Sequence, residues 1–296
     1  MKFGAIDIGT NAARLLIGEV CQSKDHNYVK KISYTRIPLR LGDDVFEIGR
    51  VSKEKSKHTI DTIKAFKLIA KIFEVHKLRA VATSAMRESS NSTKIIQKVK
   101  EKTGIEIEVI SGQEEAELIF GTFLLLDFDK ANPFVVIDVG GGSTEISFFN
   151  SGQKVASRSF EVGTIRLLKK KVDESIWKDM TFWLDENIPQ IQTMQLFGTG
   201  GNINKIHKIL GCKDNEEVSI KHMKKLYKSL LPLSLEDRID FYHLKPDRAD
   251  VIIPAMEIYL FVMEKINLNK IAVPKIGLSD GMIYKMFMET TEKEFS

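Results

Sequence analysis

Short apolar runs and helical apolar stripes alternate along the first part of the chain. Residues 2–20 predict a strand, a tight turn and further apolar structure, because short apolar runs broken by glycine are typical of buried strands. Apolar residues recur with a helical period between about Ser52 and His76. Further strands are expected at 28–41, 79–83 and 105–110, and helices at 92–103, ending at Gly104, and from an N-cap at Ser111 to about Leu126.

A second cycle of the same pattern begins after a polar turn. Residues 134–139 form a strongly apolar segment, a glycine-rich stretch follows, and residues 146–149 resume the apolar pattern. A strand, an Asp-x-Gly turn and a strand therefore occur twice, at Asp7 and at Asp138, which are 131 positions apart (138 − 7 = 131). Two copies of one unit predict two similar α/β domains, with a boundary near 126–132. Later short strands are expected at 196–197 and 270–273.

Composition restricts the class of protein without identifying it. The 296 residues suggest about two domains, and 43% hydrophobic with 28% charged residues is typical of a globular protein. A net charge of +4 is too mild to argue for DNA binding. Two cysteines cannot form a disulfide framework or a cysteine metal site. No signal peptide and no apolar stretch long enough for a membrane span are recognised, so we expect a cytoplasmic location.

The strongest local signal is the segment 138–145 (DVGGGSTE). Consecutive glycines let the backbone approach a ligand closely, and the N–H groups of such a turn bind phosphate oxygens. Ser143 and Thr144 add hydroxyl donors, and Asp138 can hold Mg²⁺ directly or through water. The alternative interpretation is a tight β-hairpin with a glycine-rich turn, although a hairpin does not need the flanking polar residues.

The first copy, residues 7–11, is less specific by itself and is also compatible with a structural turn. Paired with the second copy, it predicts two hairpins that hold phosphate from opposite sides of a cleft. Arg14 lies just beyond the turn and is a candidate anion ligand, although a lone arginine commonly forms a surface salt bridge.

Three further segments carry candidate chemistry. Residues 82–88 combine small hydroxyl residues with Arg87 and suit an oxyanion pocket, but the signal is weak alone. Residues 111–117 hold three carboxylates, which either favour the positive end of a helix or include a general base. Residues 197–203, with Gly200 and Gly201, are a third glycine-rich turn into a helix, which suits a phosphate or a nucleotide but also an ordinary strand–helix turn.

Seven ordered segments together resemble the exopolyphosphatase/guanosine pentaphosphate phosphohydrolase (Ppx/GppA) family. They are residues 5–15 (AIDIGTNAARL), 82–88 (ATSAMRE), 109–116 (VISGQEEA), 136–145 (VIDVGGGSTE), 198–201 (GTGG), 248–254 (RADVIIP) and 277–281 (GLSDG). The match covers nearly the whole chain, and seven motifs in order are far more specific than one glycine-rich loop.

The resemblance implies a fold and its division into domains. The expected fold is α/β, with two ribonuclease-H-like domains of the actin-like ATPase/sugar kinase/Hsp70 superfold and a cleft between them. Domain I would comprise residues 1–126 with a C-terminal helix at about 283–296, and domain II residues 127–282. A homodimer is common among such proteins.

The resemblance also implies roles for individual residues. Glu115 would be the base that deprotonates water, with Glu114 as the other candidate, and Glu145 would assist through the water or Mg²⁺. Asp138 and Asp7 would hold Mg²⁺. Phosphate oxygens would be bound by the following residues: Thr10, Asn11, Arg14, Arg87, Gly140, Gly141, Gly142, Ser143, Thr144, Gly200 and Gly201.

The reaction that the resemblance implies is release of the terminal phosphate from inorganic polyphosphate or from guanosine pentaphosphate (pppGpp). The residue set agrees with this reaction, because phosphoryl transfer needs mainly positioning and charge neutralisation. Two departures from the family pattern modify this expectation. Ala12 stands where a serine is usual. The sequence also shows no counterpart of the C-terminal helical domain of longer members, so we expect short polyphosphate chains as substrates. A phosphotransferase of the same superfold and a non-catalytic polyphosphate or alarmone sensor are the alternatives.

Overall fold

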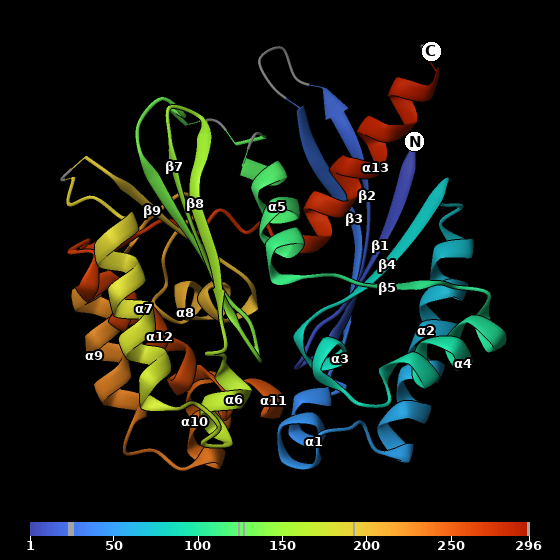
Figure 1. The fold of residues 1–296 in the computed structure, drawn as a ribbon, viewed down its shortest axis with the longest axis horizontal. Helices are drawn as coiled ribbons and strands as arrows, with labels where there is room; N and C mark the ends of the chain where they lie inside the picture. Colours follow the sequence, from blue (N-terminus) through green and yellow to red (C-terminus); the bar gives the residue numbers. More distant parts are fainter. Residues whose placement is uncertain (23–26, 124, 127, 192, 295–296) are drawn as a thin grey trace. The chain divides into compact units, whose positions relative to one another are not determined.

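The computed structural model describes residues 1–22, 27–123, 125–126, 128–191 and 193–294. Its backbone divides into two compact units (Figure 1). Unit 1 comprises Met1–Asp127 with Ile276–Ser296, and unit 2 comprises Phe128–Lys275. Residue 127, where the second domain is expected to begin, and residues 295–296 of the expected C-terminal helix lie outside the described residues. Among the described residues, no helix combines the length and apolarity that crossing a bilayer would require.

Unit 1 is built on a five-stranded sheet in the order β3-β2-β1-β4-β5. The strands are β1 (Lys2–Ile8), β2 (Ala13–Gln22), β3 (Asn27–Ile37), β4 (Lys77–Ala82) and β5 (Ile107–Val109). Strands β1, β2 and β3 form an antiparallel meander, whereas β4 runs parallel to β1 and β5 parallel to β4. In this register Asp7 on β1 lies opposite Arg14 on β2 and beside Val81 on β4.

Six helices belong to unit 1 in the described residues. They are α1 (Leu41–Ile48), α2 (Lys53–Ile72), α3 (Ser84–Glu88), α4 (Ser92–Thr103), α5 (Gly112–Phe123) and α13 (Leu278–Glu294). Helix α2 packs against α4, and α13 packs against α5 and β1, so the two pairs of helices cover opposite sides of the sheet (Figure 1). The apolar stripe predicted for α2 is buried at Ile60, Ile63 and Phe66, because its period places these side chains on one face.

Several boundaries in unit 1 differ from those expected. The strand expected to reach Leu41 ends at Ile37, just before Pro38, whose missing N–H cannot continue the ladder. Leu41 instead begins α1, a helix that the sequence pattern does not predict. Helix α5 ends at Phe123 rather than near Leu126, and α13 begins at Leu278, before the expected start near 283.

Unit 2 contains a four-stranded sheet in the order β8-β7-β6-β9. The strands are β6 (Phe134–Val139), β7 (Thr144–Asn150), β8 (Gln153–Phe160) and β9 (Gln195–Thr199). The first three are antiparallel and β9 runs parallel to β6. A small sheet pairs β10 (Val218–Ser219) with β11 (Lys270–Ile271), and the next residue, Ala272, bridges to Phe197 in parallel. Strand β8 was not expected, because most of its side chains are exposed or half-buried and show little apolar pattern.

Seven helices complete unit 2. They are α6 (Thr164–Leu168), α7 (Glu174–Asn187), α8 (Gly201–Ile209), α9 (Ile220–Leu230), α10 (Leu235–Tyr242), α11 (Pro246–Ala249) and α12 (Ile252–Lys265). Helix α12 is central, since it contacts α6, α7, α8, α9 and β6. Its Tyr259 is fully buried and donates a hydrogen bond to the carbonyl of Thr199 at 2.9 Å. The two units thus repeat one plan, a three-stranded meander followed by a strand parallel to its first member, and the expected α/β class is confirmed.

Candidate active site

The hairpin of β1 and β2 carries four of the predicted site residues of unit 1, Thr10 and Asn11 in the turn and Asp7 and Arg14 on its strands. Gly9 N–H donates to the carbonyl of Ala12 at 3.1 Å, which closes the turn. Asp7 is buried and forms an ion pair with Arg14 on the facing strand. The predicted metal ligand and the predicted phosphate ligand therefore neutralise each other in this structure.

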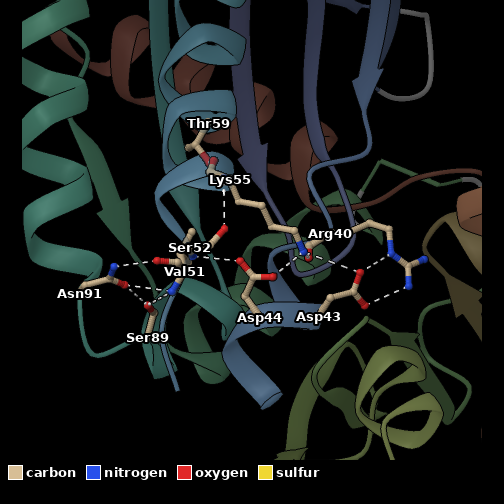
Figure 2. A network of polar contacts seen from close by, with 9 residues as sticks. All are labelled: Arg40, Asp43, Asp44, Val51, Ser52, Lys55, Thr59, Ser89 and Asn91. Carbon is tan, nitrogen blue, oxygen red and sulfur yellow. Dashed lines mark hydrogen bonds and ion pairs between the residues drawn. The ribbon is translucent and has the colours of Figure 1, made fainter. Parts of the chain in front are cut away.

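Hydrogen bonds from the start of α1 fix the position of the first turn. The carbonyl of Thr10 accepts from Gly42 N–H at 3.0 Å, and the carbonyl of Asn11 accepts from Arg40 N–H at 2.9 Å. The Thr10 hydroxyl accepts from Ala85 N–H at 3.3 Å. Arg40 itself lies in the left-handed region at φ 50°, and its guanidinium binds both carboxylate oxygens of Asp43, at 2.7 and 3.0 Å (Figure 2).

The segment after β4 forms α3, which carries Arg87. The Arg87 guanidinium donates to the carbonyl of Ile110 at 2.8 Å, just before α5 begins. This bond uses one of the five guanidinium N–H groups and fixes the direction of the side chain. Arg87 therefore ties α3 to the loop before α5, the helix that carries the two candidate bases.

Glu114 and Glu115 differ in their surroundings at the start of α5. Glu114 is exposed, its N–H donates to the Ser111 hydroxyl at 3.1 Å, and its carboxylate accepts from Ser111 N–H at 3.4 Å. This is the capping box expected from the spacing. Glu115 is half-buried. The capping role of Glu114 favours Glu115 as the residue available for chemistry.

The turn between β6 and β7 repeats the first turn with a different pair of side chains. Gly140 N–H donates to the carbonyl of Ser143 at 2.9 Å, so this segment is a β-hairpin, as its alternative interpretation holds. Asp138 lies opposite Glu145 across the two strands, and a carboxylate oxygen of each lies within 4.8 Å of the other. Glu145 is only 3% exposed, and its Oε1 accepts from the Ser159 hydroxyl at 2.7 Å.

The carbonyl groups of the glycine turn accept hydrogen bonds from the start of α6. Thr164 N–H donates to the carbonyl of Gly140 at 3.0 Å, and Ile165 N–H to that of Gly141 at 2.8 Å. The Nε of Arg166 donates to the carbonyl of Gly142 at 2.8 Å. This is the same arrangement by which Arg40 and Gly42 hold the first turn, with α6 in the place of α1.

Three N–H groups of the glycine turn have no acceptor among the described residues, whereas that of Gly140 closes the turn. Within the described part of the chain, no group accepts a hydrogen bond from the N–H of Gly141, Gly142 or Ser143. Gly142 and Ser143 are buried, and a buried N–H without an acceptor is costly. Successive free N–H groups of this kind form a concavity that binds anions, so the hairpin is also a suitable phosphate site.

The third glycine-rich turn lies against Asp138. A Cβ on Gly200 would lie 2.5 Å from the Asp138 Oδ1, and Gly200 has φ 93°, so both sterics and backbone require glycine there. Gly201 lies against Arg248, whose guanidinium donates to the Asn202 Oδ1 at 2.8 Å. Burial first, and the negative charge of Asp138 second, raise the pKa of the Tyr259 phenol well above its usual value. Tyr259 therefore stays protonated and keeps its bond to Thr199.

Asp138 and Glu145 fit a divalent cation. Two carboxylates this close repel each other, and the burial of Glu145 increases the cost. Ser159 supplies one neutral donor, which does not balance two negative charges. Mg²⁺ prefers oxygen ligands and is commonly held by one or two carboxylates, so this pair matches its requirements.

Comparison with known proteins places the chain in a family. A model described as the Ppx/GppA phosphatase family matches residues 20–290. The chain belongs to the Ppx/GppA phosphatase family. The expectation drawn from the seven motifs is thereby confirmed.

Individual relatives of this Ppx/GppA member are distant in sequence. A bifunctional 3-dehydroquinate synthase/phosphatase of Fusobacterium nucleatum is 28% identical over 272 residues, covering 84% of this chain and 41% of the relative. A guanosine-5'-triphosphate,3'-diphosphate pyrophosphatase of Photobacterium profundum is 22% identical, covering 96% of this chain and 59% of the relative. The chain therefore spans only about half the length of these two relatives.

A solved structure is similar over the whole length of this Ppx/GppA member. The crystal structure of an exopolyphosphatase from Cytophaga hutchinsonii has a TM-score of 0.83 and 25% identity, and the match covers 98% of both chains. The expected fold class, α/β with two halves of the same topology, is confirmed by this similarity and by the two sheet orders.

Some residues that shape the Ppx/GppA site are not evident from the motifs. Arg166 and Ser159 lie on or next to elements without a strong pattern, and their importance follows only from bonds across the fold. Gly163 gives a sequence signal in retrospect. A Cβ there would lie 2.4–2.5 Å from the backbone of Gly141 and Gly142, and the residue precedes an apolar pair, Ile165 with Leu167.

Proposed function

We propose that this Ppx/GppA phosphatase-family protein hydrolyses the terminal phosphoanhydride bond of inorganic polyphosphate, with pppGpp as a second substrate of the same chemistry. The supporting observation is the pairing, in one hairpin, of three N–H groups without acceptors and two close carboxylates. The first feature suits a phosphate and the second a divalent cation, which are the two components that phosphoryl transfer requires.

The proposed roles follow from what each side chain can do. The N–H groups of Gly141, Gly142 and Ser143 would bind oxygens of the terminal phosphate, with the turns at Thr10–Asn11 and Gly200–Gly201 adding further donors. Thr144 is less suitable, because its hydroxyl already donates to the carbonyl of Val162 at 2.5 Å. Asp138 and Glu145 would hold Mg²⁺, which neutralises phosphate charge when bound. Asp7 is a less suitable ligand, since Arg14 already neutralises it.

The chemical step is an in-line displacement by water. Glu115 takes a proton from the water, whose oxygen forms a bond to the terminal phosphorus. The bond between that phosphorus and the bridging oxygen breaks, and the bridging oxygen leaves with the shortened chain. Arg87, fixed in direction by Ile110, would stabilise the negative charge that spreads over the equatorial oxygens. The proposal requires Glu115 of unit 1 and the hairpin of unit 2 to act on one substrate.

The deciding experiment is release of phosphate by the purified protein with Mg²⁺. Tripolyphosphate, long-chain polyphosphate, pppGpp and ATP are compared side by side. Release from tripolyphosphate and long chains but not from ATP supports the proposal. Tight binding without release would select the sensor, and ADP-dependent formation of ATP would select the phosphotransferase. None of the relatives described above is named as either.

Variants of α5 test the assignment of the base. Glu115→Gln should lower kcat by about a hundredfold or more, the usual contribution of a general base. Glu114→Gln should keep near-normal kcat, because that carboxylate caps the helix. Glu117→Gln, an exposed position on the same helix, is the matched control for loss of one charge. Full activity of Glu115→Gln with a large loss in Glu114→Gln would transfer the role to Glu114.

Three properties stay proposals of the same kind. We expect the protein to act in the cytoplasm, to form a homodimer and to bind neither DNA nor a membrane surface. Light scattering of the purified protein measures the mass of the assembly. Titration with duplex DNA and with anionic vesicles at physiological salt tests the expected lack of binding to either.

A further inference from the structure

Unit 1 contains a cavity away from the residues assigned above. Its volume is about 910 Å³, and it lies among the end of α1, the first turn of α2 and the first half of α4. Four cationic side chains line it, Arg50, Lys53, Lys94 and Lys98, together with a single carboxylate, Glu54. A cavity of this size accommodates a ligand of several hundred Å³.

The four cations have no anionic partner among the residues that the structure describes. Within the described ranges, none of Arg50, Lys53, Lys94 and Lys98 forms an ion pair or a side-chain hydrogen bond. Elsewhere in unit 1 cations close to carboxylates are paired, as Lys55 is with Asp44 at 2.9 Å. Like charges around one concave surface repel each other, and low-dielectric walls strengthen the field that they produce. A multiply charged anion would relieve this repulsion.

The floor of the cavity is fixed by hydrogen bonds. Asn91 brackets Val51, with its Oδ1 accepting from Val51 N–H at 3.0 Å and its Nδ2 donating to the Val51 carbonyl at 2.8 Å (Figure 2). The Ser89 hydroxyl donates to the Asn91 Oδ1 at 2.7 Å, and the Ser52 N–H donates to Asp44 at 2.9 Å. The segments that carry the cations are therefore held in place before any ligand binds, which lowers the cost of binding.

Two short segments connect this cavity with the predicted phosphate-binding turns of unit 1. The first starts at Thr10 and Asn11, whose carbonyls bind the start of α1, and α1 then runs for eight residues, or about 12 Å, to the loop with Arg50. The second is α3, which carries Arg87 and ends at Glu88, two residues before Ser90 at the cavity. The cavity thus lies one short helix beyond Thr10 and Asn11, and Ser90 at its edge is three residues after Arg87 (90 − 87 = 3).

We propose that this cavity is an accessory anion site that binds the distal phosphates of a polyphosphate chain, while the terminal phosphates lie at the catalytic turns. This inference rests on the proposed function. A row of phosphates is the anion that fits this cavity best, because four separated cations around it match a repeated charge better than a single one. Chains long enough to reach both places gain affinity from the second contact.

The test compares two double variants that remove equal charge from unit 1. Lys94→Ala with Lys98→Ala removes two cations from the cavity. Lys57→Ala with Lys102→Ala, at exposed helical positions outside the cavity, is the matched control. The KM for long-chain polyphosphate should rise roughly fivefold to tenfold in the cavity variant, on the basis of two partly screened charge contacts, and less than about twofold in the control. Tripolyphosphate, which we assign to the catalytic turns alone, is the internal reference.

A binding measurement separates failure of this proposal from failure of the proposed function. Fluorescently labelled long-chain polyphosphate is titrated with each protein without divalent cation, so that no turnover occurs. Weaker binding by the cavity variant than by the control supports the accessory site even if the wild type releases no phosphate. Equal losses in both variants, or a KM for tripolyphosphate that rises as much as that for long chains, would overturn it. Competition by unlabelled pppGpp at the same concentration of phosphate shows whether a nucleotide's phosphates occupy the site as well.

Discussion

The hairpins β1–β2 and β6–β7 have the same hydrogen-bonding pattern in their turns, but the side chain opposite the aspartate has the opposite charge. In both, a glycine N–H closes the turn onto the carbonyl three residues later, and the segment after the third strand of each sheet holds the turn carbonyls. An aspartate is the second-last residue of the first strand in each. The residue opposite that aspartate is Arg14 in unit 1 and Glu145 in unit 2, again 131 positions apart (145 − 14 = 131).

Because of this one difference, Arg14 against Glu145, the two hairpins suit different ligands. In unit 1 the aspartate is neutralised by an internal cation, so the hairpin has no excess negative charge for a metal ion. In unit 2 two carboxylates face each other, an arrangement that suits a divalent cation. The repeated fold thus supplies one frame, and a substitution on the second strand determines whether it is self-neutralised or binds a cation.

The largest expected effect is on Glu145. Glu145→Gln removes the charge opposite Asp138, and phosphate release should fall by roughly a hundredfold to ten-thousandfold, the range for a group that acts on water or on the metal. Arg14→Gln should reduce release far less, by about tenfold and through KM, since its pair with Asp7 is already partly exposed to solvent. Steady-state kinetics with tripolyphosphate measures both.

Glu186→Gln is the control for Glu145→Gln, because it removes one carboxylate of unit 2 at an exposed position of α7. Its activity should match the wild type. If Glu145→Gln keeps kcat within about threefold of the wild type, the carboxylate pair has no part in the reaction.

Sequence alone was enough for much of this comparison. The two Asp-x-Gly turns, the strands 134–139 and the helix 92–103 follow from local patterns of apolar residues and glycine, and the structure has them at those residues. The opposition of Asp138 to Glu145 also follows from a short turn, because the turn length sets the register of a hairpin. By contrast, the sequence left Arg14 as an anion ligand or as part of a surface salt bridge with no partner named, and its pairing with Asp7 is evident only from the register of the strands.

Cation binding gives the next largest effect. Mg²⁺ at about one hundred times its Kd should stabilise the wild type by about 2.7 kcal/mol, which corresponds to several degrees in Tm. Asp138→Asn combined with Glu145→Gln should abolish this shift, whereas Asp7→Asn should keep it. Thermal unfolding with and without Mg²⁺, at matched ionic strength, measures the difference.

An equal loss of the shift in Asp7→Asn would contradict the comparison, because it would mean that the hairpin of unit 1 contributes to the cation site in spite of Arg14. The double variant without Mg²⁺ should be at least as stable as the wild type, since it no longer opposes two carboxylates. A lower stability of the metal-free variant would show that the pair is stabilised by another contact.

Arg166 tests the way in which the glycine turn is held. Arg166→Ala removes a buried guanidinium that binds the Gly142 carbonyl, which should cost about 2 kcal/mol of stability and raise KM roughly tenfold as the N–H groups lose their alignment. Arg166→Lys keeps the charge but not the position of Nε, so it should restore stability more than KM. Kinetics and thermal unfolding of both variants distinguish the two effects; an unchanged KM in Arg166→Ala would limit the residue to a structural role.

The part of the site that sequence did not predict consists of such contacts between distant segments. Arg166, Ser159 and Arg40 lie 24, 14 and 29 residues from the groups that they bind, Gly142, Glu145 and Asn11. No periodicity or turn rule relates residues at these separations, since their proximity comes from the sheet order and from the helices that follow it. The capping box at Ser111 could be predicted because both partners lie within one helical turn.

The smallest effect is expected at Arg40, which holds the first turn through its backbone rather than its side chain. Arg40→Gly relieves the strain of a left-handed conformation at φ 50°, which should stabilise the fold by about 1 kcal/mol. It also removes the ion pair with Asp43 and adds conformational freedom to the unfolded chain, and each of these two effects should destabilise the fold by about the same amount. The N–H that binds Asn11 and the carbonyl that accepts from Lys55 remain. Stability should therefore change by less than about 1 kcal/mol and kcat by less than about twofold. A tenfold loss of kcat would instead give the Arg40 guanidinium a role on the substrate, and would make the two turn-holding arginines functionally alike where the structure makes them differ.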